Sequence, residues 1–178
     1  MAAGHTEIAI RVRTIGQLFN SLDPSPFREK DLDAGVEEFL VGWVRELPPG
    51  GAFRITVHLP PEEAQKPEAA EIPAAFSHYF QYRAEASARE LRELLRIGQR
   101  SLLIGAAALV ACLFGSQIAA KTIANVTAAR VVEESLIIVG WVANWRPIEI
   151  YLYEWWPIRR RIRLFRRIAT AHLRVKAG

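Results

Sequence analysis

The sequence is poor in the residues that usually carry chemistry. It has one cysteine, Cys112, so neither a disulfide within the chain nor a cysteine-based metal site can form. Its four histidines, His5, His58, His78 and His172, show no metal-ligand spacing. No metalloprotease, nucleophile-elbow, phosphate-loop or dinucleotide-binding pattern occurs. We therefore expect no catalytic residue, no metal and no cofactor, and we interpret the protein as a non-enzyme.

Charge is absent from one long stretch of the chain. Ser101–Ala120 (SLLIGAAALVACLFGSQIAA) contains no charged side chain. At about 1.5 Å of rise per residue, a helix of this length covers roughly 30 Å, the thickness of bilayer hydrocarbon. The sequence therefore predicts a transmembrane helix over residues 101–121 and an integral protein of the inner or plasma membrane.

The remaining charges are unevenly distributed, and their pattern predicts an orientation. Residues 1–80 carry twelve acidic and seven basic side chains, whereas residues 81–178 carry seven acidic and sixteen basic ones. Basic residues cluster before the apolar stretch and after residue 157. By the positive-inside rule, both clusters belong in the cytoplasm, so the chain should cross the membrane twice. The first residues lack the positively charged segment followed by an apolar run that marks a signal peptide, so we expect no cleavable signal peptide.

The N-terminal residues 1–59 are typical of a small cytoplasmic β–α–β module. Glu7–Arg13 and Phe53–Leu59 alternate apolar and polar residues, as half-buried strands do. Between them, apolar residues fall on one face of Lys30–Leu47, which predicts a helix that the following Pro-Pro-Gly-Gly ends.

Two segments are expected to connect this module to the membrane. Residues 60–73 are rich in proline, glutamate and alanine and predict an exposed, extended linker. Residues 74–100 follow a helical pattern without a breaker and predict a cytoplasmic helix that continues into the membrane. The expected fold class is an α+β membrane protein, in which this long helix leads into a two-helix transmembrane hairpin.

The second half of the hairpin is less regular. After a short extracytoplasmic loop (122–134), residues 135–157 predict a second transmembrane helix, although its charged residues are costly in lipid. In one geometry this segment spans fully and is tilted, with Arg146 near the midplane, and this is the geometry we adopt. In the other, the span ends at Trp145, and Arg146 lies at the cytoplasmic interface. Residues 158–178 predict a basic amphipathic helix on the membrane surface.

Small residues on the predicted spans are candidates for helix packing. They recur at four-residue spacing, which lets helix backbones approach closely in lipid. The set comprises Ala107, Ala111, Gly115, Ala119, Gly140 and Asn144. Asn144 could also bond across to Ser116 or Gln117. Self-association and ordinary packing within the hairpin both fit, and the second needs fewer assumptions.

Charged residues form two further candidate sites. Arg146 and Glu149 are three residues apart, so they can pair on one helix face at membrane depth. The arginines after the second span suit anionic lipid headgroups better than nucleic acid. They are Arg159, Arg160, Arg161, Arg163, Arg166 and Arg167.

These patterns favour a membrane-anchored interaction or assembly protein with both termini in the cytoplasm. The expected partners are anionic membrane lipids and either further copies of the chain or another membrane protein, with no nucleic acid. The alternative is a subunit of an oligomeric transporter or ion pathway that uses Arg146 and Glu149.

Overall fold

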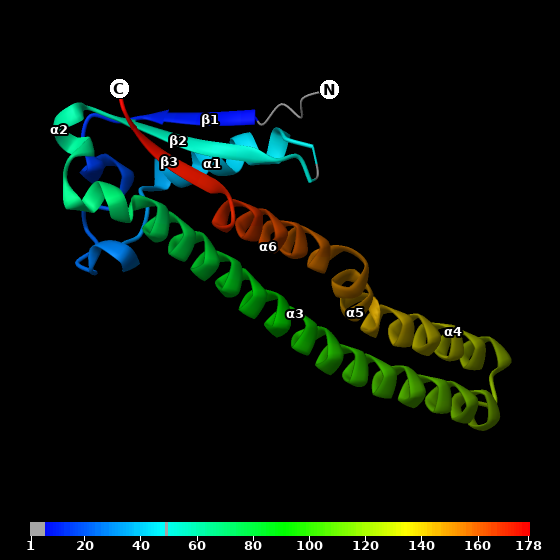
Figure 1. Cartoon of the computed structure of the whole chain (residues 1–178). Helices are drawn as coiled ribbons and strands as arrows, with labels where there is room; N and C mark the ends of the chain where they lie inside the picture. The colour runs from blue at the N-terminus through cyan, green and yellow to red at the C-terminus, as the bar shows by residue number, and fades with distance from the viewer. Residues whose placement is uncertain (1–5, 49) are drawn as a thin grey trace. The chain divides into compact units, whose positions relative to one another are not determined.

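The computed structural model describes residues 6–48 and 50–178. The described chain is mostly helical, with a three-stranded parallel sheet and one long apolar helix (Figure 1). The strands are β1 (Thr6–Arg11), β2 (Phe53–Leu59) and β3 (His172–Ala177). The helices are α1 (Ala34–Glu46), α2 (Pro61–Ala64), α3 (Pro67–Thr122), α4 (Val126–Ala143), α5 (Trp145–Glu149) and α6 (Trp155–Ala169). Short 3₁₀ turns cover Ile15–Leu18 and Phe27–Glu29, and a π-helical turn covers Ile150–Glu154.

The chain divides into two compact units. The first contains the residues up to Ser87 together with Arg160–Gly178, and the second contains Ala88–Arg159. Both α3 and α6 contribute residues to each unit. Each unit is described by itself below.

The first unit is built on the parallel sheet, whose strand order is β1–β2–β3. Ile8 is aligned with Ile55, and Ile55 is aligned with Leu173. Because side chains alternate between the two faces of a strand, these apolar residues share one face and enter the core. The predicted strand–helix–strand order of the N-terminal part is confirmed, with β2 at the expected residues.

Helix α1 supplies the crossover from β1 to β2. Asp33 caps its amino end by accepting a hydrogen bond from the Gly35 backbone N–H at 2.9 Å. Leu40 and Val44 are buried in the core, as the periodicity predicted. Phe39 and Trp43 belong to the same predicted apolar face, but 44% and 46% of their surface stays exposed. Their rings pack edge to face, with centroids 6.2 Å apart.

The prediction of an extended linker over residues 60–73 is wrong. This stretch contains α2 and the start of α3, in which Ala69 and Ile72 are buried. Proline is compatible with the first turn of a helix because its missing N–H would have no partner there. Pro61 and Pro67 each begin a helix, and the alanines and glutamates that follow are good helix formers.

The prediction of a surface helix through residues 158–178 is also wrong. Helix α6 ends at Ala169, and the chain then forms β3, in parallel register with β2. The apolar stripe expected to face lipid is buried in protein instead: Ile162, Phe165 and Ile168 are all buried. Phe165 packs against Phe80 of α3, with ring centroids 6.0 Å apart.

The predicted long helix that contains the uncharged stretch is confirmed as α3, but the segment that runs back after it is not the single helix that was predicted. Helix α3 continues without interruption from Pro67 to Thr122. The loop predicted over residues 122–134 is much shorter, because Asn125 caps α4 and accepts hydrogen bonds from the backbone of Thr127 and Ala128. Residues 135–157 are divided among α4, α5, the π-helical turn and the start of α6.

A polar network attaches α1 to α3 in the first unit. The Tyr79 hydroxyl donates to Glu37 Oε2 at 2.6 Å, and Arg83 Nη2 lies 2.7 Å from Glu37 Oε1. Burial raises the pKa of Tyr79 well above its ordinary value, and the hydrogen bond to Glu37 raises it further.

The pairing of β3 with the sheet can be tested by Leu173→Ala. Truncating this buried side chain should lower the free energy of unfolding of the first unit by about 2 to 4 kcal/mol. Hydrogen exchange of the β2 backbone amides would report the loss. Arg174→Ala, at the next and exposed position of β3, is the matched control and should leave exchange nearly unchanged. Equal effects of the two variants would contradict the pairing.

The Tyr79 network predicts a pH dependence of stability. An unfolded tyrosine ionises near pH 10, whereas folded Tyr79 keeps its proton to higher pH. The folded state therefore binds more protons above pH 10, and the free energy of unfolding should fall as pH rises through that range. Tyr79→Phe should abolish this part of the fall and cost about 1 to 2 kcal/mol at neutral pH. Denaturant titrations across pH would measure both effects, with Tyr82→Phe as the exposed control.

Candidate functional site

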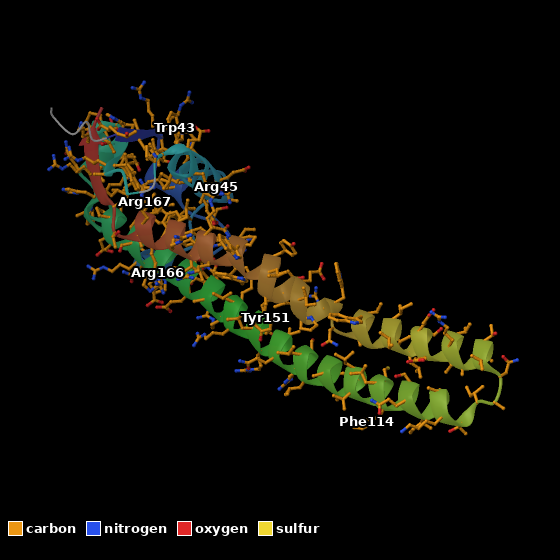
Figure 2. The ribbon with its side chains drawn as sticks, turned by 90° about the vertical axis from the view of Figure 1, so that its right-hand side faces the viewer. Trp43, Arg45, Phe114, Tyr151, Arg166 and Arg167 are labelled. Atoms are coloured by element: carbon orange, nitrogen blue, oxygen red, sulfur yellow. The ribbon has the colours of Figure 1, made fainter. Side chains whose placement is uncertain are left out.

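The apolar part of α3 is the most unusual surface of the second unit. Among the described residues, α3 is the one helix long and apolar enough to cross a membrane, with a mean hydropathy of 2.1 over its most apolar window. Only 11% of that window is buried. Leu103 is 72% exposed and Phe114 is 62% exposed. Figure 2 shows Phe114 on the side of α3 that faces away from α4. Exposed apolar surfaces of this kind mark sites of contact with a membrane or with another protein.

Helix α4 runs back along this part of α3, and two glycines permit the close approach (Figure 1). A Cβ atom placed on Gly140 would lie 2.8 Å from Leu109 Cδ1 and 3.3 Å from Cys112 Cβ. A Cβ atom on Gly105 would lie 2.8 Å from the Ala143 carbonyl oxygen. Gly105 is therefore required for the helices to pack at this distance, because the obstructing atom is backbone, whereas the atom nearest to Gly140 is the movable end of the Leu109 side chain.

The Asn144 side chain joins the two helices at one end of their contact. Its Nδ2 donates to the Gly105 carbonyl at 3.0 Å and to the Gly140 carbonyl at 2.9 Å. The predicted partners Ser116 and Gln117 are wrong, because the antiparallel register places Asn144 beside Gly105. Ser116 instead donates to the Leu113 carbonyl of its own helix.

The predicted row of small residues is divided between two faces of α3. Ala119 is buried and Gly115 contacts Leu136, whereas Ala107 and Ala111 are exposed. A four-residue step turns a helix by about 400°, so the row drifts by roughly 40° at each step. The face that meets α4 follows mixed steps of three and four residues, through Gly105, Leu109, Cys112, Ser116 and Ala119.

The charged cluster around Arg146 is larger than predicted. Arg146 Nη1 lies 3.0 Å from Glu149 Oε2, and the guanidinium also contacts Glu154, with Nη2 3.3 Å from Oε2. Glu154 was not expected because a regular α-helix would turn it away from Arg146. The π-helical turn Ile150–Glu154 changes that register, and such turns are rare and not visible in sequence periodicity.

Contacts between the return segment and α3 show which part of α3 lies beside Arg146. Asn144 lies beside Gly105, and the side chains of Ile150 and Tyr151 pack against Gly98. Arg146 is therefore alongside the segment between Gly98 and Gly105, where the uncharged stretch of α3 begins. The full-span geometry, with Arg146 near the middle of that stretch, does not fit this register.

The six arginines of α6 differ in their surroundings. Arg160, Arg163 and Arg166 are exposed. The Arg159 guanidinium lies 5.5 Å from the ring centre of Trp155. Arg167, in contrast, is used within the protein: Nη2 donates to the Gly51 carbonyl at 2.5 Å, and the guanidinium stacks 5.2 Å from the ring centre of Phe53.

Comparisons with known proteins add no functional assignment. No family model matches the chain, and no curated protein and no solved structure shows significant similarity to it. Among the described residues, no group of three or more histidine, cysteine, aspartate or glutamate side chains is arranged to hold a metal ion.

The contact between α3 and α4 predicts a disulfide. Gly140→Cys would place its Cβ 3.3 Å from Cys112 Cβ, close to the separation that a disulfide needs. The nearest obstacle is the flexible end of Leu109. Mild oxidation should therefore link the two thiols within one chain, detectable by mass spectrometry of the linked peptides. Val139→Cys, on the exposed side of α4, should stay unlinked. A disulfide that forms only between chains would contradict this packing.

Proposed function

We propose that the chain is a non-enzymatic, membrane-anchored interaction or assembly protein with both termini in the cytoplasm. One observation carries the proposal: the uncharged stretch of α3 is long enough to span hydrocarbon, and most of its residues are exposed. Lipid is the environment that stabilises such a surface without a protein partner. A helix that is apolar around most of its circumference is found in the core of a protein or across a membrane, and not exposed to water.

In this proposal, α3 and α4 form a transmembrane hairpin. The uncharged part of α4 and α5, Ser135–Trp145, covers only about 16 Å at 1.5 Å per residue. Charges bound it on both sides, and each side contains an ion pair: Arg130 with Glu134, 3.1 Å apart, and Arg146 with Glu149. Pairing lowers the cost of bringing such charges near hydrocarbon. Arg146 then belongs at the cytoplasmic interface, beside the interfacial aromatic side chains of Trp145 and Tyr151.

The orientation follows from the arginines. Arg89, Arg92, Arg96 and Arg100 precede the uncharged stretch of α3, and the exposed arginines of α6 follow the return. Both groups favour the cytoplasmic side and its anionic headgroups. The inner or plasma membrane is the location that this charge pattern fits.

The interaction role rests on surfaces that the chain leaves uncovered. Ala107 and Ala111 present small side chains on the face of α3 that α4 does not cover, which suits a helix of another copy or of a membrane partner. In the first unit, the half-exposed pair Phe39 and Trp43 offers a second contact surface. The alternative, an ion pathway through Arg146 and Glu149, lacks comparable support because Arg146 already has two carboxylate partners.

Labelling of single cysteines would test the membrane arrangement. In a Cys112→Ser background, His78→Cys and His172→Cys should react with an impermeant thiol reagent only from the cytoplasmic side. Val126→Cys, at the exposed start of α4, should react only from the opposite side. Labelling of all three from one side would overturn the hairpin.

Copurification in mild detergent would test the assembly role. The full chain should elute as a defined oligomer or with a stoichiometric membrane partner, and Ala107→Leu should weaken that association more than Leu103→Ala does. A monomer without a partner would contradict the role. Arg146→Leu distinguishes the assembly role from the alternative ion pathway, because assembly should survive this change whereas conduction through an ion pathway would not.

A further inference from the structure

The parallel sheet of the first unit has helices on one face only. Its strands follow one another in the order β1–β2–β3, and connections between neighbouring parallel strands are right-handed. Helix α1 and the first-unit parts of α3 and α6 therefore belong on the same face. The buried residues agree with this, because those of the three helices join one core with the apolar residues of all three strands.

The opposite face of the sheet, which we call the open face, is polar. Side chains alternate along a strand, so the residues between those that enter the core project from this face. The open face consists of Glu7, Ala9 and Arg11 of β1, Arg54, Thr56 and His58 of β2, and His172, Arg174 and Lys176 of β3. Every open-face residue of the two outer strands is exposed.

Positive charge dominates the open face. Arginine or lysine side chains from all three strands share it with one carboxylate, that of Glu7. Glu7 accepts a hydrogen bond from the Thr56 hydroxyl, and Lys176 Nζ lies 3.5 Å from the same carboxylate oxygen. Long side chains of the two outer strands thus meet over β2, which explains why Thr56 is buried on a face without a helix. The exposed guanidinium groups of Arg11 and Arg174 flank this arrangement.

An all-parallel sheet with an uncovered face is unusual, because such sheets normally have a packed layer on each side. The open face therefore indicates a layer that another molecule supplies. The same face of a second copy does not suit it, since basic side chains would meet basic side chains. Electrostatic complementarity requires an acidic partner.

The side chains that the open face lacks distinguish among acidic partners. It has one apolar residue, Ala9, and no phenylalanine, tyrosine or tryptophan. Surfaces that bind a membrane interface gain affinity from apolar side chains that enter it, and surfaces that bind single-stranded nucleic acid gain affinity from aromatic side chains on which bases stack. An acidic polypeptide requires only charge and hydrogen bonding, which this face offers.

We propose that the open face binds an acidic segment of a protein partner. The carboxylates of this segment pair with Arg11 on one outer strand and Arg174 on the other, because a guanidinium group matches the geometry of a carboxylate. The proposal rests on the interaction role given above, for which it names a partner, and is independent of the transmembrane hairpin.

The test uses the full-length chain in phosphatidylcholine nanodiscs and a fluorescently labelled polyglutamate peptide, with binding followed by fluorescence anisotropy. Binding should be saturable and should weaken as salt is added, because exposed charges are screened. Arg11→Glu combined with Arg174→Glu should weaken binding about tenfold or more, since two attractive contacts become repulsive. The neutral pair Arg11→Gln with Arg174→Gln should give an intermediate loss.

The matched control is Arg163→Glu combined with Arg166→Glu. It changes the net charge by the same amount at exposed positions of α6, off the open face, and should alter affinity by less than about threefold. Circular dichroism would verify that all variants are folded. Absence of saturable binding, or equal weakening by the two charge-reversed pairs, would overturn the proposal.

Two further titrations, with phosphatidylserine vesicles and with single-stranded DNA, compare other polyanions. Tighter binding of either one than of the peptide, lost in the Arg11 and Arg174 variants, would assign the open face to that polyanion and overturn the proposal. Failure of peptide binding by a chain that still elutes as a defined oligomer would reject this partner and leave the assembly role intact.

Discussion

The parallel pairing of β3 with β2 is the constraint on which the first unit depends. Two neighbouring parallel strands cannot be joined by a tight turn. The chain therefore has to leave the sheet after Leu59, at the carboxyl end of β2, and return to the opposite end of the sheet before His172, where β3 begins. Everything between, including all of the second unit, is a single crossover connection. Both ends of this connection are therefore attached to the same small sheet.

The same pairing explains why α6 is amphipathic. Its buried residues Phe165 and Ile168 pack in the core that β1 and β2 begin, while several of its arginines stay in solvent. An amphipathic basic helix after a hydrophobic segment resembles a membrane-surface helix in composition. What distinguishes the two is whether the apolar stripe has protein to pack against, and here α3 provides it through Phe80.

Local patterns were sufficient to predict much of the fold from the sequence, and non-local pairings were not. The alternation in Phe53–Leu59 and the unbroken period of α3 from residue 74 onward were correctly interpreted, because each signal lies within its own element. Leu173 and Val175 also alternate with polar residues, but this short signal makes sense only beside β2.

The candidate site divides in the same way. Gly140 and Asn144 were identified from their small or amide side chains, and both lie in the helix contact. The register that pairs Asn144 with Gly105, the π-helical turn that brings Glu154 to Arg146, and the use of Arg167 by Gly51 all depend on tertiary packing.

The position of β3 after the second unit also sets the order of synthesis. When β2 leaves the ribosome, its apolar residues Phe53, Ile55 and Val57 have a neighbour on only one side. The other edge of β2 stays unpaired while Pro60–Ala171 are translated, and an open apolar edge is prone to wrong pairing. The sheet is completed only after the helix pair has been made. A chain that ends before His172 would therefore lack β3 and would leave this edge of β2 without its partner strand.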